Sequence, residues 1–537
     1  MSDSIKQEGD QASHPMRNLA EAAKLLAELR GADPLTALND LGAWIETVRD
    51  ISGSDEKARG DILALIQDAS EPHVSALLAQ YFAEPAGGHA AREPKWNALN
   101  NYLRVLTGAL YISATRLLKQ MAANPSLQPA AVAAATRSLH ACRMLAKTYL
   151  FHYQSIPEKL WRLAYAVFLD AEEAGCAATP VRMHAAYKTA STVNAELLRL
   201  LLLQSSAPDM LPPEQIEVAD RVIEQLGGDF TLRPPGTADN PFLFHPGSDL
   251  PPQRAPSTPP PAEEGYRYFG AGAGYAALEK LKREFAKSAA EGATFGKDIP
   301  LHAQAAAIRH LVAFWGPANP YAAPARTPAS GALKVVHGFA PAWQHISSAG
   351  TGKLELSLVE EGDAPAVHAA AEPDWTLKDS GGNELGAEVP QAAADWARCG
   401  AVLAVTKPGE AGCSLAVIRS MHSEPEHPLH ANIAILTSAP QAVRLLPHVT
   451  KNDDAVYSTE AMRQFATFGG GVRAIILSDG TGAGAQKPNF MVPPDQWKEG
   501  RVYEATIGGK PRLLRSLQLL RRGDDFVRAT FEWVEKA

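Results

Sequence analysis

The hydrophobic pattern of the chain changes near Leu333, and this change limits the fold more than any other feature. Ahead of it, apolar residues recur three and four positions apart, which is the spacing of one helix face, in runs separated by prolines and glycines. Beyond it, β-branched runs with a period of two replace the helical spacing. We therefore predict a multidomain α + β protein, with an N-terminal α-helical bundle or solenoid and C-terminal antiparallel β-barrels.

Several of the expected helices carry start signals. Asp33 can cap a helix whose first position suits Pro34. The same reasoning predicts that helices begin at Pro72, Pro94 and Pro180, because proline is tolerated in a first turn and disrupts a helix interior. Short turns between such helices favour antiparallel neighbours, which is the arrangement of a bundle.

Turn-forming residues divide the chain further. The proline-rich run PGSDLPPQRAPSTPPPA cannot form a helix or a central strand. Gly508–Gly509 falls between two expected strands and predicts a two-residue hairpin turn. The expected parts are a disordered tail over 1–14, an α-helical domain over 15–245, a Pro-rich linker over 246–263, a small helical unit over 264–318, a linker over 319–332, a first barrel over 333–446 and a second small barrel over 447–537.

Composition excludes several classes of protein. The 51 Lys and Arg against 59 Asp and Glu give a net charge of −8, which argues against a nucleic-acid-binding protein. Four cysteines in 537 residues predict no disulfide framework. No apolar run approaches the roughly 18–20 residues of a membrane span, and the polar first residues do not resemble a signal peptide. We expect a cytoplasmic protein without a membrane span.

Catalytic motifs are not found in the sequence. It contains no G-x-S-x-G, H-E-x-x-H or C-x-x-C motif, so we expect no enzyme, no catalytic residue and no metal ligand. One alternative stays open: His422, His427 and His430 fall within nine residues, and imidazoles at such spacing can bind a metal. A metal-dependent enzyme is therefore retained as a minor hypothesis.

Basic residues gather near the C-terminus. Because adjacent strand positions face opposite ways, Arg512 and Arg515 should point to opposite faces. The cluster fits either an exposed hairpin whose charges prevent edge pairing or a site for an anionic partner. Its members are Lys510, Arg512, Arg515, Arg521 and Arg522.

The strand-rich part resembles a known family. Its segments ALKVVHGF, DWTLKDSGGNELGAEV, WARCGAVLAVTK and CSLAVIRSM follow one another between residues 332 and 421. In this order they resemble a PilZ-type β-barrel, the family of bacterial receptors for cyclic di-GMP. The helical half is similar to the long α-helical region joined to such barrels in β-proteobacterial proteins.

The resemblance implies a ligand site built from two short motifs. One is an arginine pair, R-x-x-x-R, ahead of the first strand, and the other is D/N-x-S-x-x-G on the barrel. Guanidinium groups bind phosphates bidentately and small residues let a nucleotide approach the backbone. The residues that match are Arg326, Asp379 and Ser380. The chain departs from both motifs: Ala322 and Ser330 flank Arg326 at four residues, and neither frame of DSGGNELG completes the second motif.

Three functional hypotheses follow. The first is a non-enzymatic signalling adaptor that needs no cofactor, takes cyclic di-GMP as its candidate ligand and acts through protein partners of unknown identity. The second is a helical scaffold whose partners dock on residues 15–245 and whose barrels bind no nucleotide. The third is the metal-dependent enzyme.

Overall fold

The computed structural model divides the chain into two compact units, Met1–Ala322 and Ala323–Ala537, each considered by itself. The tail expected over 1–14 lies outside the residues that the structure describes. Those described are 16, 18–50, 55–84, 89–183, 190–233, 240–258, 260, 265–287, 295–321, 324–350, 373–424, 427–448, 471–477 and 487–534.

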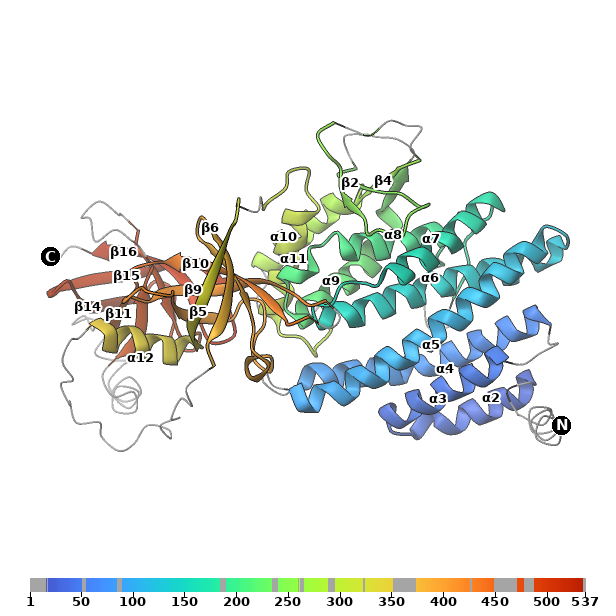
Figure 1. Cartoon of the computed structure of the whole chain (residues 1–537), viewed down its shortest axis with the longest axis horizontal. Coiled ribbons are helices and arrows are strands. Elements are labelled where there is room, and N and C mark those ends of the chain that lie inside the picture. The colour runs from blue at the N-terminus through green and yellow to red at the C-terminus, as the bar shows by residue number, and fades with distance from the viewer. Residues whose placement is uncertain are drawn as a thin grey trace. The chain divides into compact units, whose positions relative to one another are not determined.

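The first unit, called here the helical unit, consists of packed helices and one small sheet (Figure 1). The sheet has the strand order β1-β4-β2-β3 and is formed by β1 (Thr231–Arg233), β2 (Phe242–Phe244), β3 (Gln253–Arg254) and β4 (Arg267–Gly270). The helices are α2 (Leu19–Glu28), α3 (Pro34–Asp50), α4 (Glu56–Ala83), α5 (His89–Met121), α6 (Gln128–Phe151), α7 (Glu158–Glu173), α8 (Val193–Gln204), α9 (Pro213–Leu226), α10 (Gly274–Lys287) and α11 (Leu301–Phe314).

The start of α3 is as predicted. The backbone N–H of Thr36 donates to Asp33 Oδ2 at 3.0 Å, so Asp33 caps a helix that begins at Pro34. None of the described helices is long and apolar enough to cross a membrane.

Three other helix starts were wrongly predicted from proline. Helix α4 continues through Pro72, and α5 begins at His89, ahead of Pro94. A proline removes one backbone hydrogen bond from a helix, and the long buried faces of these helices outweigh that loss. Helix α8 begins at Val193 instead of Pro180, because the Thr192 hydroxyl caps it.

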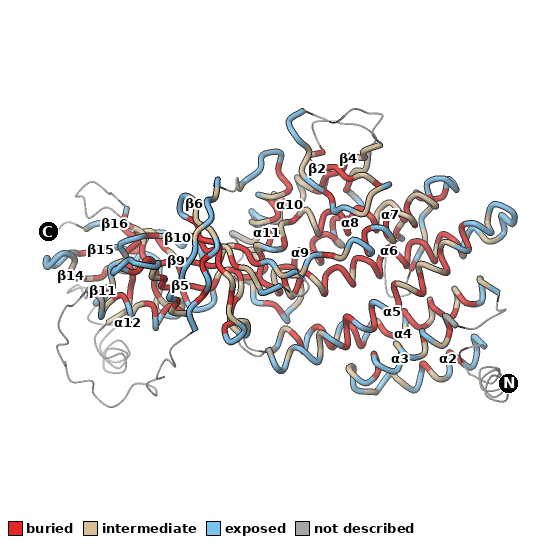
Figure 2. Tube along the Cα trace, viewed as in Figure 1, coloured by how far each residue is buried: buried red, intermediate tan, exposed pale blue. Residues whose placement is uncertain are grey.

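One continuous core fills the helical unit. Leu278 of α10 and Ile308 of α11 belong to the same cluster of buried side chains as the residues of α3 to α9. The segment expected as a separate small helical unit, 264–318, therefore packs with the preceding helices. Figure 2 shows that α6 and α9 are buried along most of their length.

The second unit, called here the barrel unit, contains two closed antiparallel barrels of six described strands each. Barrel 1 has the order β10-β7-β6-β5-β8-β9. Its strands are β5 (Thr327–His337), β6 (Trp375–Gly381), β7 (Glu384–Glu388), β8 (Val402–Thr406), β9 (Ser414–His422) and β10 (His430–Thr437), and helix α12 (Phe339–Gly350) follows β5. The predicted fold class, helices followed by antiparallel barrels, is confirmed.

Barrel 2 has the order β11-β12-β13-β16-β15-β14. Gly508 and Gly509, with φ of +58° and +74°, form the turn between β14 and β15, as predicted. Its strands are β11 (Gln441–Pro447), β12 (Val472–Ile476), β13 (Asn489–Val492), β14 (Val502–Ile507), β15 (Lys510–Arg522) and β16 (Val527–Val534).

The strands set the limits of the two barrels. Strand β5 begins at Thr327, inside the segment expected as a linker, 319–332, because this stretch pairs with β6. Strand β11 pairs with β12 and β14, so barrel 2 begins at Gln441 and not at residue 447.

Candidate functional site

The predicted Arg326 lies in a group of polar side chains on barrel 1, named here the Arg326 site. Arg326 directly precedes β5, and its Nη1 donates to Asp379 Oδ1 and to Asn432 Oδ1, both at 2.8 Å. Its Nη2 donates to Glu384 Oε2 at 2.7 Å. The members of the site are Arg326, Asp379, Glu384, Arg419, His430 and Asn432, and they come from β6, β7, β9 and β10 and from the residue before β5.

The strand register explains why these side chains meet. Asp379, Gly386, Asn432 and Ser420 are successive partners across β6, β7, β10 and β9, so they form one row across four strands. Gly386 has no side chain, and Arg326 bonds to the residues on both sides of it. A Cβ at Gly386 would lie 2.5 Å from Asp379 Oδ1, so this position needs glycine to leave room for the carboxylate.

A β-bulge in β6 lies next to this row. In β6 the partners of Gly386 and Ala387 are Asp379 and Leu377, which leaves Lys378 as an extra residue. Lys378 instead forms an ion pair of 2.8 Å with Glu388. Bulges often occur beside functional sites, where they reorient side chains.

Solvent reaches the arginine side of the site. Arg326 is 21% exposed and Asp379 26%, whereas Glu384 is 6% exposed. Glu384 is a buried carboxylate that two guanidinium groups neutralise, because Arg419 Nη1 also lies 3.2 Å from its Oε1. Arg326 and Arg419 are partly exposed, so an anion from solution can reach them. Each guanidinium can then bind that anion in place of the carboxylate.

His430 is the titratable imidazole of the site. Burial lowers the pKa of His430 below its ordinary value of 6.5; the Asp379 carboxylate acts against this shift, and the Arg326 guanidinium adds to it. His430 is therefore neutral at pH 7.

The three predicted ligand residues lie together. Arg326 contacts Asp379 directly, and Ser380 is the cross-strand partner of Thr327, whose hydroxyl donates to the Ser380 carbonyl at 3.1 Å. Glu384 and Arg419 were not predicted. The signal for Arg419 was a single arginine in the otherwise buried run SLAVIRSM of β9.

Two of the three histidines proposed as metal ligands are cross-strand partners. His430 is opposite His422 in the pairing of β9 with β10, and His422 and His427 both approach Glu424, at 3.5 and 3.9 Å. The described part of the chain contains no group of three or more His, Cys, Asp or Glu residues that could hold a metal ion.

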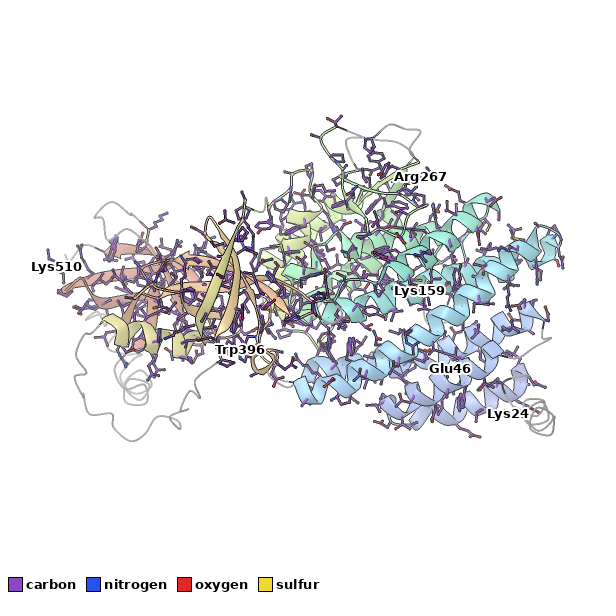
Figure 3. All side chains as sticks on the ribbon, in the orientation of Figure 1. Lys24, Glu46, Lys159, Arg267, Trp396 and Lys510 are labelled. Carbon is purple, nitrogen blue, oxygen red and sulfur yellow. The ribbon has the colours of Figure 1, made fainter. Side chains whose placement is uncertain are left out.

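The basic residues near the C-terminus lie on β15, and Figure 3 labels Lys510 at its beginning. Arg512 lies over the ring of Trp533 at 5.5 Å, and Arg515 pairs with Glu532 at 3.2 Å. Trp533 and Glu532 are adjacent on β16, so the two arginines point to opposite faces, as predicted.

The helical unit contains a second set of charged residues, named here the buried charge cluster. Lys147 Nζ lies 2.7 Å from Asp220 Oδ2 and 2.8 Å from Glu217 Oε2, and Arg143 donates to Asp220. Burial alone would raise the pKa of Glu196, but the hydrogen bond with His140 and the charge of Arg199 hold it at about 2. The members are His140, Arg143, Lys147, Glu196, Arg199, Glu217 and Asp220 on α6, α8 and α9, all of them buried.

The structure has helices followed by two closed antiparallel barrels, with Arg326 ahead of the first strand in contact with Asp379 on the second, which is the arrangement expected from the resemblance to PilZ-type receptors. The comparison with protein families agrees with this class. Residues 20–236 match the family described as the N-terminal domain of the cyclic-di-GMP receptor FimW. The match ends ahead of the barrels, so the Arg326 site lies outside it. Neither the comparison with curated proteins nor that with solved structures gave a match.

Proposed function

We propose that the protein is a non-enzymatic, cytoplasmic signalling receptor that binds cyclic di-GMP at the Arg326 site and passes the signal to a protein partner. The match of residues 20–236 to the N-terminal domain of a cyclic-di-GMP receptor supports the ligand class. The position of the helical region ahead of the barrels supports the comparison with receptors built in the same order.

The observation that carries the ligand site is the position of Arg326. Its guanidinium donates to Asp379, Glu384 and Asn432, and the side chain remains 21% exposed. A phosphodiester can take the place of a carboxylate in such an arrangement, because both accept paired N–H···O bonds from one guanidinium. Close to Arg326, Gly381 allows a tight backbone approach, since a Cβ there would lie 2.2 Å from the Ala325 carbonyl oxygen.

Calorimetric titration of the full chain with cyclic di-GMP tests this proposal. We expect heat of binding for the wild type and a loss of at least tenfold in affinity for Arg326→Ala, which removes the charged donor. Arg515→Ala is the matched control, because it removes an arginine paired with Glu532 in barrel 2 and should leave the affinity unchanged. A wild-type chain that gives no heat at high ligand concentration would leave the helical scaffold without nucleotide as the better hypothesis.

The helical unit is the proposed contact for the protein partner, because packed amphipathic helices form grooves suited to partner helices. Hydrogen exchange of the full chain with and without cyclic di-GMP tests whether the barrel signal reaches it. We expect changed protection in peptides of α2 to α9 as well as in barrel 1. Protection that changes in barrel 1 alone would contradict the transmission step.

A further inference from the structure

The sequence has one arginine where the PilZ-type linker motif has two, yet a second guanidinium lies at the site. Arg419 Nη1 is 3.2 Å from Glu384 Oε1, and Arg326 Nη2 is 2.7 Å from Glu384 Oε2. Each oxygen of one carboxylate therefore holds one arginine. Two cations that are distant in sequence are thereby kept side by side.

The spacing of these two arginines suits a phosphate. A phosphodiester, like a carboxylate, has two oxygens that are bonded to one central atom and share a single negative charge. Arginines that each bind one oxygen of a carboxylate can bind the two free oxygens of a phosphodiester in the same way. Glu384 thus occupies the position that the chemistry of the site offers to a phosphate group.

Arg419 lies at a β-bulge of β9. In the pairing of β9 with β10, Ile418 is opposite Ile433 and Ser420 is opposite Asn432, so Arg419 is the extra residue of a β-bulge. It is 36% exposed, between two buried neighbours.

We propose that Arg419 supplies the second phosphate-binding guanidinium of the Arg326 site, and that Glu384 competes with the ligand phosphate for both arginines. This inference rests on the proposed binding of cyclic di-GMP. Arg326 and Arg419 balance Asp379 and Glu384 in the free site, so an arriving phosphate meets two carboxylates of its own sign. Removing the charge of Glu384 should therefore strengthen binding.

Titration of four full-length variants with cyclic di-GMP tests the inference. We expect Arg419→Ala to weaken binding at least tenfold, and Arg419→Lys to weaken it less, because lysine keeps the charge and loses the bidentate fork. Glu384→Gln should bind several-fold more tightly than the wild type. Arg515→Ala in barrel 2 is the control, and circular dichroism of each variant reports whether the barrels remain folded.

The outcomes separate the inference from the proposed function. Wild-type binding that Arg326→Ala abolishes and Arg419→Ala preserves would overturn the role of Arg419 and leave the ligand site in place. A wild type that does not bind removes both. The opposite signs expected for Arg419→Ala and Glu384→Gln distinguish ligand contact from structural support, because a purely structural Glu384 would lose affinity when changed to glutamine. If Arg419→Ala does not fold, the comparison of Arg419→Lys with Glu384→Gln still decides.

Discussion

The buried charge cluster of the helical unit and the Arg326 site of the barrel unit use the same residue types and differ in their access to water. Arg143 and Asp220 are 1% and 4% exposed, whereas Arg326 and Asp379 are 21% and 26% exposed. In the cluster, three cations and three carboxylates neutralise each other away from solvent. Replacing one of them by an external anion would therefore require a large free energy. In barrel 1, Arg326 is partly exposed, so an external anion can replace one of its carboxylate partners. Exposure therefore separates a structural ion network from a candidate ligand site.

The strongest test of this comparison removes one partner from the buried charge cluster. Asp220→Ala leaves Arg143 and Lys147 with less neutralising charge in a buried site, and should lower the free energy of unfolding by about 3–5 kcal/mol. Urea denaturation of the full chain, followed by helical circular dichroism, measures this loss. The control is Asp249→Ala, whose partner Arg162 is exposed, and which should change little. Equal effects of the two substitutions would mean that burial does not set the importance of these pairs.

A smaller effect on stability is expected at Gly386, where the backbone lies close to the Asp379 carboxylate. Gly386→Ala places a Cβ 2.5 Å from Asp379 Oδ1 and should displace the carboxylate, at a cost of about 1–3 kcal/mol in the barrel unit. Gly412→Ala is the matched control in barrel 1, since a Cβ there meets nothing within 4 Å. Hydrogen exchange in β6 and β7 measures the difference, and full protection of Gly386→Ala would show that the row tolerates a methyl group.

The smallest expected effect is the loss of stability at low pH, which should differ between the barrel unit and the helical unit. Burial lowers the folded pKa of His430 and of His337 from 6.5, so the unfolded chain binds more protons and the barrel unit loses stability as the pH falls below about 6.5. The pKa of Glu196 falls from 4.5 to about 2, so its contribution to the helical unit is present above pH 4.5 and is lost between 4.5 and 2.

Pulsed hydrogen exchange at stepwise lower pH can follow both units in one chain. Barrel peptides should lose protection first, and His430→Gln should reduce that early loss. Helical peptides that lose protection before the barrels do would contradict the assignment of Glu196 as a carboxylate held charged by its neighbours.

Local signals predicted the parts of the fold that neighbouring residues decide. The Asp33 cap and the Gly508–Gly509 turn need only a few adjacent residues, and both are present. Proline was misleading at Pro72, because packing along the whole of α4 outweighs one lost hydrogen bond. The general order, helices and then barrels, followed from the change of hydrophobic period.

The candidate site was only partly open to prediction. Family resemblance identified Arg326 and Asp379, which prove to be in contact. Glu384 and Arg419 depend on which strands become neighbours and on an extra residue in β9, and neither is encoded in local spacing. A lone charge inside an apolar strand was the available sign, and such a sign does not specify its partner.

The closure of both barrels restricts how another polypeptide can attach to this protein. In a closed ring each described strand has a neighbour on both sides, which leaves less backbone for an added strand than an open sheet does. Within the described residues, open rims occur at β1 and β3 of the small sheet, and β3 is two residues long. We therefore expect a partner to recognise the barrels mainly through their side chains, and the outer side of β1 to be open to strand addition.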